Sequence, residues 1–393
     1  MLTNYISNPI KIIERTLNLA SPKLIGHGKR VAYKMFKALY QMEAYNDEKI
    51  HDICMLGLLH DIGAYKTEDI NSILGFDKEN EWNHAIYGYL FLKYFSPIRS
   101  LAPALLFHHA GHSQMLHLSE EHQMLAKLLR QSDQADTHQC LNGGYSNCTD
   151  MHEDAEFNLI LYKSNISDKD IESYIKMLAF SIDFRSPQTM IHTFAATYVA
   201  EVLAILAGAD EIQISSLKTG AMLHDIGKMG IPLHILEGTN KKLSPSDMAI
   251  MKSHVVLSGD VLSGCVSEEV LNIAINHHEK LNGRGYPKGL DEHSLAYLDR
   301  IMAVADVFSA ISVSRSYQSA FSKEKSIEIL SKFKHENLLD HSIIELAINH
   351  YDEIISSLNA KSKPIIATYE AIEEERHWIH SKIATGEYDI VNM

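Results

Sequence analysis

Cysteine and long apolar segments are both scarce in this sequence. Four of its 393 residues are cysteines, and they form no CxxC pair and no spacing typical of disulfides. Such usage is typical of a reducing compartment, so we expect a cytoplasmic protein. The sequence has no run of 18 apolar residues and no apolar leader segment, so we expect neither a membrane span nor a signal peptide.

Positive charge is also in deficit. The chain has 36 lysines and arginines against 50 aspartates and glutamates, which gives a formal net charge of −14. Nucleic acid polymers and anionic membranes bind basic surfaces, so neither is expected as the main partner. A small anionic ligand remains compatible if local cations surround it. The sequence leaves open whether the chain forms a homodimer.

Alternating strand patterns are rare, whereas helical periodicity is common. Residues 190–209 and 216–229 carry apolar side chains at intervals of three and four. Ser186 and Pro187 predict the start of a helix over 188–207, and the stretch 244–247 predicts a capping box that opens the helix carrying His254. The predicted fold class is therefore all-α, with cores for two domains.

Histidine is abundant, with 23 residues, and its spacing repeats between the two halves of the chain. In each half a histidine is followed by an HDIG motif, another histidine, a histidine pair and an aspartate. The first set is His27, His60, Asp61, His84, His108, His109 and Asp133, and the second is His192, His224, Asp225, His254, His277, His278 and Asp306. We expect two tandem helical domains, residues 1–150 and 186–393, joined by a linker or connecting helix over 151–185.

The second set suits divalent metal ions. Its ligands are imidazole nitrogens and carboxylate oxygens without thiolates, which favours Fe, Mn, Zn or similar ions. Asp225 has two oxygens and can bridge two cations. Lys228 follows Asp225 by three residues, so on a helix it would lie beside any metal-bound phosphate.

The stretch HHEKLNGRGYP, residues 277–287, places the histidine pair at the end of a helix. Gly283 and Gly285 permit positive φ, and Pro287 stiffens the exit. Arg284 offers a cation, and Tyr286 offers a flat ring with a hydroxyl. Such a loop suits a phosphate-bearing ligand with a stackable base, although a plain helix end followed by a turn is the alternative.

The motifs MLHDIGKMGIP, HHEKLNGRGYPKGL and IMAVADVF resemble those of the HD-GYP family, a branch of the HD phosphohydrolases, over roughly residues 180–330. The resemblance implies a helical domain with a two- or three-metal centre that cleaves cyclic di-GMP or a related 3′,3′-cyclic dinucleotide, such as cyclic GMP-AMP, to a linear 5′-phosphorylated dinucleotide. It implies that His192, His224, Asp225 and Asp306 hold one metal and that Asp225, His254, His277 and His278 hold the second. It implies substrate contacts from Lys228, the loop residues 283–287 and Arg315.

Three departures from the family pattern affect these expectations. Gln188 stands where members with a third metal have a glutamate, so we expect two ions. Ala195 replaces the usual arginine, and Ser309 replaces an aspartate, which puts substrate preference in doubt.

The first half of the chain keeps the candidate second metal site but lacks other features. Ala64 stands at the position of Lys228, and no Gly-Tyr-Pro loop follows its histidine pair. The N-terminal domain is therefore expected to be regulatory or dimerising, or else a 5′-nucleotidase acting on the linear product. A further alternative is that the whole chain is a sensor that binds a cyclic dinucleotide without cleaving it.

Overall fold

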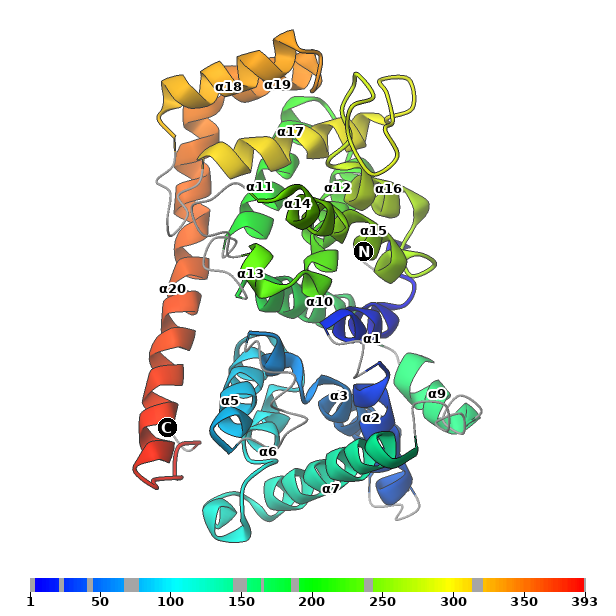
Figure 1. The fold of residues 1–393 in the computed structure, drawn as a ribbon, viewed down its shortest axis with the longest axis vertical. Helices are drawn as coiled ribbons and strands as arrows, with labels where there is room; N and C mark the ends of the chain where they lie inside the picture. The colour runs from blue at the N-terminus through cyan, green and yellow to red at the C-terminus, as the bar shows by residue number, and fades with distance from the viewer. Residues whose placement is uncertain are drawn as a thin grey trace. The chain divides into compact units, whose positions relative to one another are not determined.

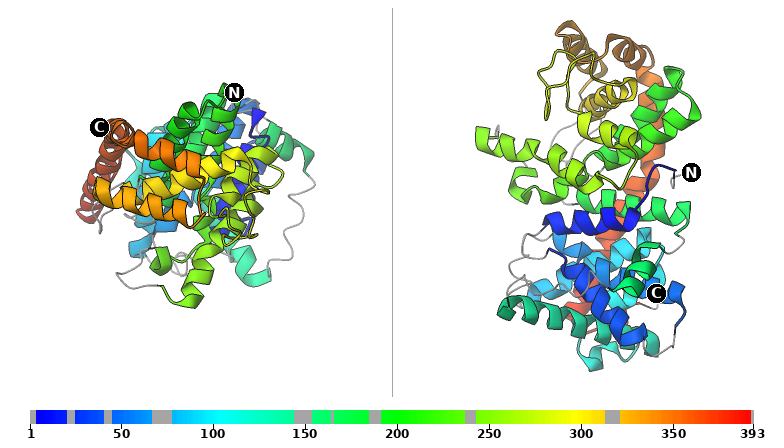
Figure 2. Two further views of the ribbon diagram at one scale, coloured as in Figure 1. Left: turned by 90° about the horizontal axis from the view of Figure 1, so that it is seen from above. Right: turned by 90° about the vertical axis from the view of Figure 1, so that its right-hand side faces the viewer.

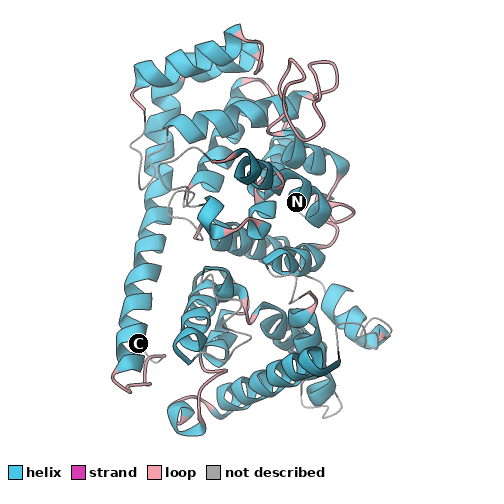
Figure 3. Cartoon of the chain, in the orientation of Figure 1, coloured by secondary structure: helices cyan, strands magenta, loops and turns pink. Residues whose placement is uncertain are grey.

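The computed structural model describes residues 4–20, 25–40, 45–66, 78–143, 154–163, 166–184, 191–236, 243–312 and 321–391. Over these ranges the regular secondary structure is helical, which confirms the predicted all-α class (Figure 3). The described residues contribute only isolated β-bridges, such as Ile6 with Val266. No described helix combines the length and the apolar character needed to cross a bilayer.

The chain forms two compact units. The N-terminal unit comprises Ile10–Met177 and Thr368–Met393, and the C-terminal unit comprises Met1–Pro9 and Leu178–Ala367. The chain passes from one unit to the other at the start of α1 (Pro9–Ala20) and inside helices α10 (Asp168–Asp183) and α20 (Tyr351–Ala384). Figures 1 and 2 show α20 as one unbroken helix, coloured orange to red.

The N-terminal unit is built around α2, which packs against α3 and α7. The η3 turn after α3 packs against α5, and α5 packs against α6. The helices of this unit before α10 are α1 (Pro9–Ala20), α2 (His27–Tyr40), α3 (Asp47–Leu59), η3 (Ile62–Lys66), α5 (Lys78–Phe95), η4 (Arg99–Leu101), α6 (Ala102–Leu106), η5 (His112–Met115), α7 (Glu120–Gly143) and α9 (Ala155–Lys163).

The C-terminal unit repeats this plan around α11, which packs against α12 and α17. The η7 turn after α12 packs against α15, and α15 packs against α16. Between α10 and α20 the described helices are α11 (His192–Leu206), α12 (Glu211–Leu223), η7 (Ile226–Gly230), α13 (Leu233–Leu236), α14 (Pro245–Lys252), α15 (His254–Leu262), α16 (Glu268–Asn276), α17 (Tyr297–Ser312), α18 (Lys323–His335) and α19 (His341–Asn349).

Local sequence explains where several of these helices begin. The side chain of Asp210 accepts a hydrogen bond from the backbone N–H of Gln213 at the start of α12, and Ser267 caps α16 in the same way. Small residues on α11, among them Ala196 and Ala200, are fully buried against α17 and allow close helix packing. These contacts hold the first histidine of the C-terminal set beside the HDIG turn.

Two predicted helices differ from the structure. The described part of the 188–207 helix is α11, which begins at His192, whereas residues 185–190 lie outside the described ranges. Ser244 caps α14 as predicted, but α14 ends at Lys252, and His254 begins a separate helix, α15. Nδ1 of His254 donates a hydrogen bond to the Met251 carbonyl at 2.6 Å and so occupies an acceptor that a continuous helix would use.

Candidate metal centres

Three histidines of the C-terminal unit are oriented by the backbone. The Nδ1–H groups of His224, His254 and His277 each donate to a carbonyl three residues earlier, at 2.6 Å in every case. A carbonyl oxygen can only accept, so these bonds place the proton on Nδ1 and leave the Nε2 lone pair unprotonated. Each of these Nε2 atoms faces the others and the aspartates.

Asp225 lies at the centre of this cluster and presents its two oxygens to different histidines. Its Oδ2 is 3.1 Å from Nε2 of His224, and its Oδ1 is 3.3 Å from Nε2 of His254. Asp306 Oδ1 lies 3.1 Å from Nε2 of His192. The carboxylate of Asp225 is therefore placed to bridge two ligand groups.

The histidine pair completes the cluster. Nε2 of His277 is 3.4 Å from Nε2 of His254 and 4.0 Å from Asp225 Oδ1, whereas His278 faces Asp306 Oδ2 through Nδ1 at 3.8 Å. Helix α16 ends at Asn276, as predicted, so both histidines can point to the same side. The structure thus brings together all seven candidate ligands of the second set.

Several of the facing atoms lack a hydrogen-bond donor. His224 Nε2 and Asp225 Oδ1 are buried and have no hydrogen-bond partner among the described residues. Groups such as His192, His224 and Asp306 place their ligand atoms within 4.8 Å of one another. Buried lone pairs that face each other are unfavourable unless a cation lies between them, so the residues present fit divalent metal ions.

Two of the histidines and one aspartate have the protonation states that metal ligation requires. Burial lowers the pKa of His254 to about 4 and that of His278 to about 3. Burial alone would raise the pKa of Asp225, but the neighbouring His224 and the charge of Lys228 hold it well below its usual range. At neutral pH these histidines are therefore neutral and Asp225 is charged.

Lys228 reaches Asp225 by a route that differs from the predicted one. Helix α12 ends at Leu223, and Lys228 lies in the 3₁₀ turn η7. His224, Asp225 and Lys228 therefore do not share one face of an α-helix. Residues three apart align in a 3₁₀ turn, and Lys228 Nζ lies 2.5 Å from Asp225 Oδ2. The predicted proximity of Lys228 to the cluster therefore holds.

Glu279 organises the loop that follows the histidine pair. Its carboxylate is 1% exposed and accepts hydrogen bonds from the backbone N–H groups of Lys288, Gly289 and Leu290, at 2.7, 3.1 and 2.9 Å. Sequence reasoning gave this residue no role, although its place directly after the histidine pair was a usable signal. The loop is therefore held by the buried carboxylate of Glu279 and its hydrogen bonds to the backbone, and not by a helix cap.

The two loop glycines act differently. Gly283 has a φ of 71°, as predicted, but Gly285 is not in the positive-φ region. A Cβ at Gly285 would lie 2.3 Å from Cα of Glu279, so close backbone approach requires a glycine there.

The loop places the Tyr286 ring against the cluster, and a lysine of α14 lies over this ring. The Tyr286 ring lies 4.7 Å from the ring of His278, and Lys252 Nζ lies 4.8 Å from the Tyr286 ring centre. Arg284 and Pro287 are exposed. The candidate substrate residue Arg315 and the departure at Gln188 lie outside the described residues.

The seven candidate ligands of the N-terminal unit also come together. His27 Nε2 lies 3.2 Å from Asp133 Oδ1, and His60 Nε2 lies 3.4 Å from Asp61 Oδ2. Nε2 of His84 is 3.0 Å from Nε2 of His109 and 3.5 Å from Nε2 of His108. His60 Nε2 is buried without a hydrogen-bond partner among the described residues, so this cluster fits metal ions by the same criterion.

Two residues that sequence reasoning missed lie behind His27. Asp136 accepts a hydrogen bond from Nδ1 of His27 at 2.8 Å and pairs with Arg30. Burial lowers the pKa of His27, but hydrogen bonds with Asp133 and Asp136 and the charge of Asp61 outweigh it and raise the pKa to about 10. In the C-terminal unit Ser309 takes the place of Asp136, and burial lowers the pKa of His192.

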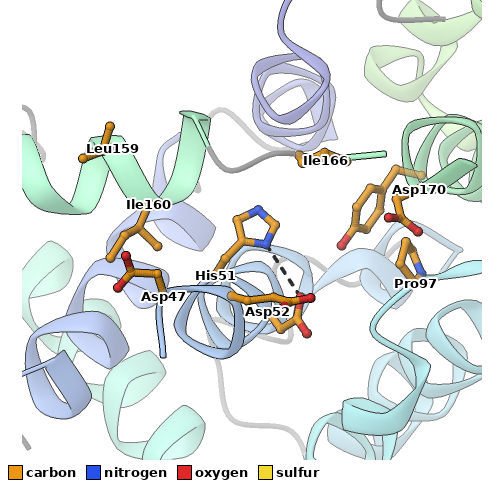
Figure 4. A pocket seen from close by; sticks show the side chains of 10 residues that line it. Asp47, His51, Asp52, Pro97, Leu159, Ile160, Ile166 and Asp170 are labelled. Atoms are coloured by element: carbon orange, nitrogen blue, oxygen red, sulfur yellow. Dashed lines mark ion pairs between the residues drawn. The ribbon is translucent and has the colours of Figure 1, made fainter. Parts of the chain in front are cut away.

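The N-terminal unit also contains a cavity of about 530 Å³, which none of these ligands lines. Figure 4 shows His51 and Asp52 at its edge, with His51 Nδ1 3.6 Å from Asp52 Oδ1. Asp47, Asp170 and Tyr174 line it as well. The cavity adds no ligand to either histidine cluster.

Several known proteins are similar to this chain in sequence. The 3′3′-cGAMP-specific phosphodiesterase 1 of Vibrio cholerae is 24% identical over 392 residues, which cover 86% of this chain and 90% of the relative. The 3′3′-cGAMP-specific phosphodiesterase 2 of the same organism is 34% identical over 182 residues, covering 46% of this chain and 34% of the relative. The cyclic di-GMP phosphodiesterase response regulator RpfG of Xanthomonas campestris is 31% identical over 178 residues, covering 44% and 47%. The chain spans less than half the length of the last two proteins.

One solved structure and one family model were also matched. A crystal structure of a cyclic GMP-AMP-specific phosphodiesterase of Vibrio cholerae aligns with a TM-score of 0.49 and 15% identity, covering 90% of this chain and 98% of that one. The family model of the HD domain matches residues 173–343, which include every ligand of the C-terminal cluster. Residues 173–343 therefore match the HD domain family, and most of this segment lies in the C-terminal unit.

Proposed function

We propose that the chain is a metal-dependent phosphodiesterase that hydrolyses a 3′,3′-cyclic dinucleotide to the linear 5′-phosphorylated dinucleotide. One observation carries this proposal: seven histidines and aspartates converge in the C-terminal unit, with Asp225 facing two ligand groups and Lys228 beside it. Relatives named as phosphodiesterases for 3′3′-cGAMP and cyclic di-GMP support the substrate class.

Two divalent ions, Fe, Mn or similar, are proposed for this centre. His192, His224, Asp225 and Asp306 would hold one ion, and Asp225, His254, His277 and His278 the other. Bound ions of this kind lower the pKa of water toward neutrality and polarise a phosphoryl oxygen. The buried, unprotonated Nε2 atoms and the two carboxylates suit such ions in charge and in hydrogen-bond state.

The chain's own groups then position the phosphodiester. Lys228 Nζ lies 2.5 Å from Asp225 Oδ2, so its ammonium is held where a phosphate bound at the cluster carries negative charge. The negative charge that builds up as the ribose 3′-oxygen leaves is stabilised by this fixed cation. Because Lys228 is 16% exposed on its side chain, solvent screens its charge only weakly.

The loop over 283–287, together with Arg315, is proposed to hold the rest of the ligand. The Tyr286 ring lies against His278, and Lys252 lies over it, so this ring is proposed to contact a purine base while phosphate remains at the cluster. Arg284 is exposed and available to a second phosphate. The choice between cyclic di-GMP and cyclic GMP-AMP stays open.

The N-terminal unit is proposed to have one of two roles. In the first role it acts in regulation or dimerisation. In the second role it is a 5′-nucleotidase that acts on the linear product and uses a metal held by its own ligand cluster. The proposed boundaries are residues 1–150 for the N-terminal domain, 151–185 for the linker and 186–393 for the catalytic domain. A cytoplasmic location remains an expectation. The double variant His60→Ala, Asp61→Ala distinguishes the two roles. If the N-terminal unit is a 5′-nucleotidase, this variant should still open the cyclic dinucleotide but should no longer remove the 5′-phosphate from the linear product.

A sensor that binds without cleavage is the competing proposal. The test is incubation of purified protein, loaded with Mn²⁺ or Fe²⁺, with cyclic di-GMP and separately with cyclic GMP-AMP, followed by chromatography of the products. We expect a linear dinucleotide from at least one ligand, and no product from the His224→Ala, Asp225→Ala variant. Bound but intact ligand in both incubations would favour the sensor.

A further inference from the structure

The two ligand clusters agree in the distance from the first histidine to the last aspartate but differ behind the first histidine. Nε2 of His27 lies 3.2 Å from Asp133, and Nε2 of His192 lies 3.1 Å from Asp306. On the opposite ring nitrogen, Nδ1 of His27 donates to the Asp136 carboxylate at 2.8 Å, whereas Nδ1 of His192 meets the hydroxyl of Ser309 at 3.3 Å. The same ring position therefore has a charged acceptor in one unit and a neutral one in the other.

Asp136 is fixed in place by Arg30. Arg30 Nε lies 2.9 Å from Asp136 Oδ1, and its Nη2 lies 2.9 Å from Oδ2, so the pair is bidentate. Asp136 is fully buried, and Arg30 is further held by a bond from Nη1 to the Ile25 carbonyl at 2.7 Å. A bidentate, buried pair holds the carboxylate in one orientation toward His27.

The C-terminal unit lacks both members of this pair. Arg30 and Asp136 each follow a candidate ligand, His27 or Asp133, by three residues, and the residues at those positions in the second set are Ala195 and Ser309. Ser309 has a single hydroxyl proton, which it donates to the Asp306 carbonyl at 2.8 Å. Its oxygen can therefore accept from His192, but it carries no charge.

This difference bears on metal affinity. A carboxylate that accepts the Nδ1–H of a histidine fixes the ring and increases the electron density on Nε2, which strengthens the bond of Nε2 to a cation. A hydroxyl at 3.3 Å does the same to a smaller extent, because the hydrogen bond is longer and the acceptor is neutral.

We propose that the N-terminal unit is a divalent-metal centre in its own right and that Asp136, fixed by Arg30, makes its His27 side bind a divalent ion more tightly than the His192 side of the C-terminal centre. Asp136 is a positioning residue, because it touches the histidine and not the ion. The inference rests on the metal dependence in the proposed function but requires no turnover. Partial chelation should then empty the C-terminal centre first.

The test uses the full chain with one centre disabled at a time. The His224→Ala, Asp225→Ala variant leaves the N-terminal centre, and the His60→Ala, Asp61→Ala variant leaves the C-terminal one. Each is stripped of metal and titrated with Mn²⁺ by equilibrium dialysis, with bound metal measured by mass spectrometry. We expect tighter binding by the N-terminal centre and a loss of about 10- to 100-fold on adding Asp136→Ser.

Control variants separate affinity from folding. Asp154→Ser removes another carboxylate of the same unit, one that accepts a hydrogen bond from the backbone N–H of Phe157, and should leave Mn²⁺ binding unchanged. Circular dichroism in metal-free buffer checks that each variant is folded. The reciprocal variant Ala195→Arg, Ser309→Asp should tighten binding at the C-terminal centre, a gain that misfolding cannot produce.

Three results would overturn the inference: no Mn²⁺ on the N-terminal centre, Mn²⁺ binding there that is no tighter than at the C-terminal centre, or unchanged affinities in both the folded Asp136→Ser variant and the reciprocal variant. Absence of cyclic dinucleotide cleavage in a chain that still shows these affinities would instead refute the proposed function alone.

Discussion

At the scale of single residues, Lys228 is the group whose role is most separable from metal binding. Its ammonium pairs with Asp225 but would not ligate a cation, so Lys228→Ala should leave the Mn²⁺ content unchanged. We expect kcat/KM for the cyclic dinucleotide to fall about 100- to 1,000-fold, as when one preorganised charge donor is lost. Lys228→Arg should recover part of the activity, whereas equal rates for wild type and Lys228→Ala would remove this role.

Asp183 gives a prediction about pH. It is buried, its Oδ1 accepts a hydrogen bond from Thr193 at 3.1 Å, and burial followed by the charge of Asp225 raises its pKa to about 8. The native state keeps a proton that the unfolded state releases near pH 4. The stability contributed by Asp183 is therefore complete below about pH 4 and is lost as the pH rises to about 8.

The Asp183→Asn variant cannot lose that proton. Relative to the wild type, the free energy of unfolding of the metal-stripped variant should rise between pH 5 and pH 8 and then level off. Urea unfolding at pH 5, 6, 7 and 8 measures this difference. Parallel curves for the two proteins would show that Asp183 does not titrate in this range.

The sequence predicted which residue types meet, but not how single side chains are supported. Seven ligands could be paired between the halves because motif order is kept when loop lengths change. Asp136 and Glu279 were missed because their effects depend on contacts with residues distant in sequence or in a loop, which periodicity does not report. The requirement for glycine at position 285 was predicted correctly, but the expected reason, a positive φ, was wrong. A Cβ at this position would collide with the backbone of Glu279.

At the scale of elements, the loop over 279–290 depends on one buried carboxylate. Glu279→Ala removes the acceptor of three backbone N–H groups, so amide exchange of Lys288, Gly289 and Leu290 should accelerate by at least about tenfold. We also expect lower kcat/KM, with unchanged Mn²⁺ content. Hydrogen exchange followed by mass spectrometry measures the first effect.

A matched control lies two residues after this loop. The Glu292 side chain is exposed, so Glu292→Ala changes charge equally without removing these bonds. If both variants exchange at the same rate as wild type, Glu279 does not hold the loop.

Helix type was more predictable than helix ends. Helices were correctly predicted within 190–209 and 216–229, where α11 and α12 lie. However, His224 and Asp225 lie where α12 gives way to a 3₁₀ turn, and His254 begins a new helix. Histidine side chains bonded to carbonyls three residues earlier compete with the helix at these points. Such competition is set by the cluster and not by local propensity.

At the scale of the whole molecule, the N-terminal unit includes the end of the chain. Tyr87 donates to Glu373 at 3.4 Å, Lys93 pairs with Glu375 at 2.5 Å, and the ring of Trp82 lies 6.1 Å from that of Tyr388. Truncation after Ala367 should therefore expose α5, increase its amide exchange and lower the melting temperature of this unit by several degrees.

The C-terminal cluster is expected to keep its Mn²⁺ in the truncated chain, because all its ligands lie between His192 and Asp306. Arg376→Ala, which removes a cation 5.5 Å from the Tyr87 ring centre, should have a smaller effect in the same direction. Unaltered exchange in α5 after truncation would contradict this account of the unit.

The contact between Trp82 and Tyr388 also sets an order of events during synthesis. Helix α5 leaves the ribosome long before its partners on the last turns of α20 and beyond exist, so the unit translated first is the one completed last. Until these partners are synthesised, the apolar residues of α5 that they cover are exposed and can associate with other unfolded chains. Nascent chains halted before residue 368 should therefore recruit chaperones through α5, while the finished protein does not.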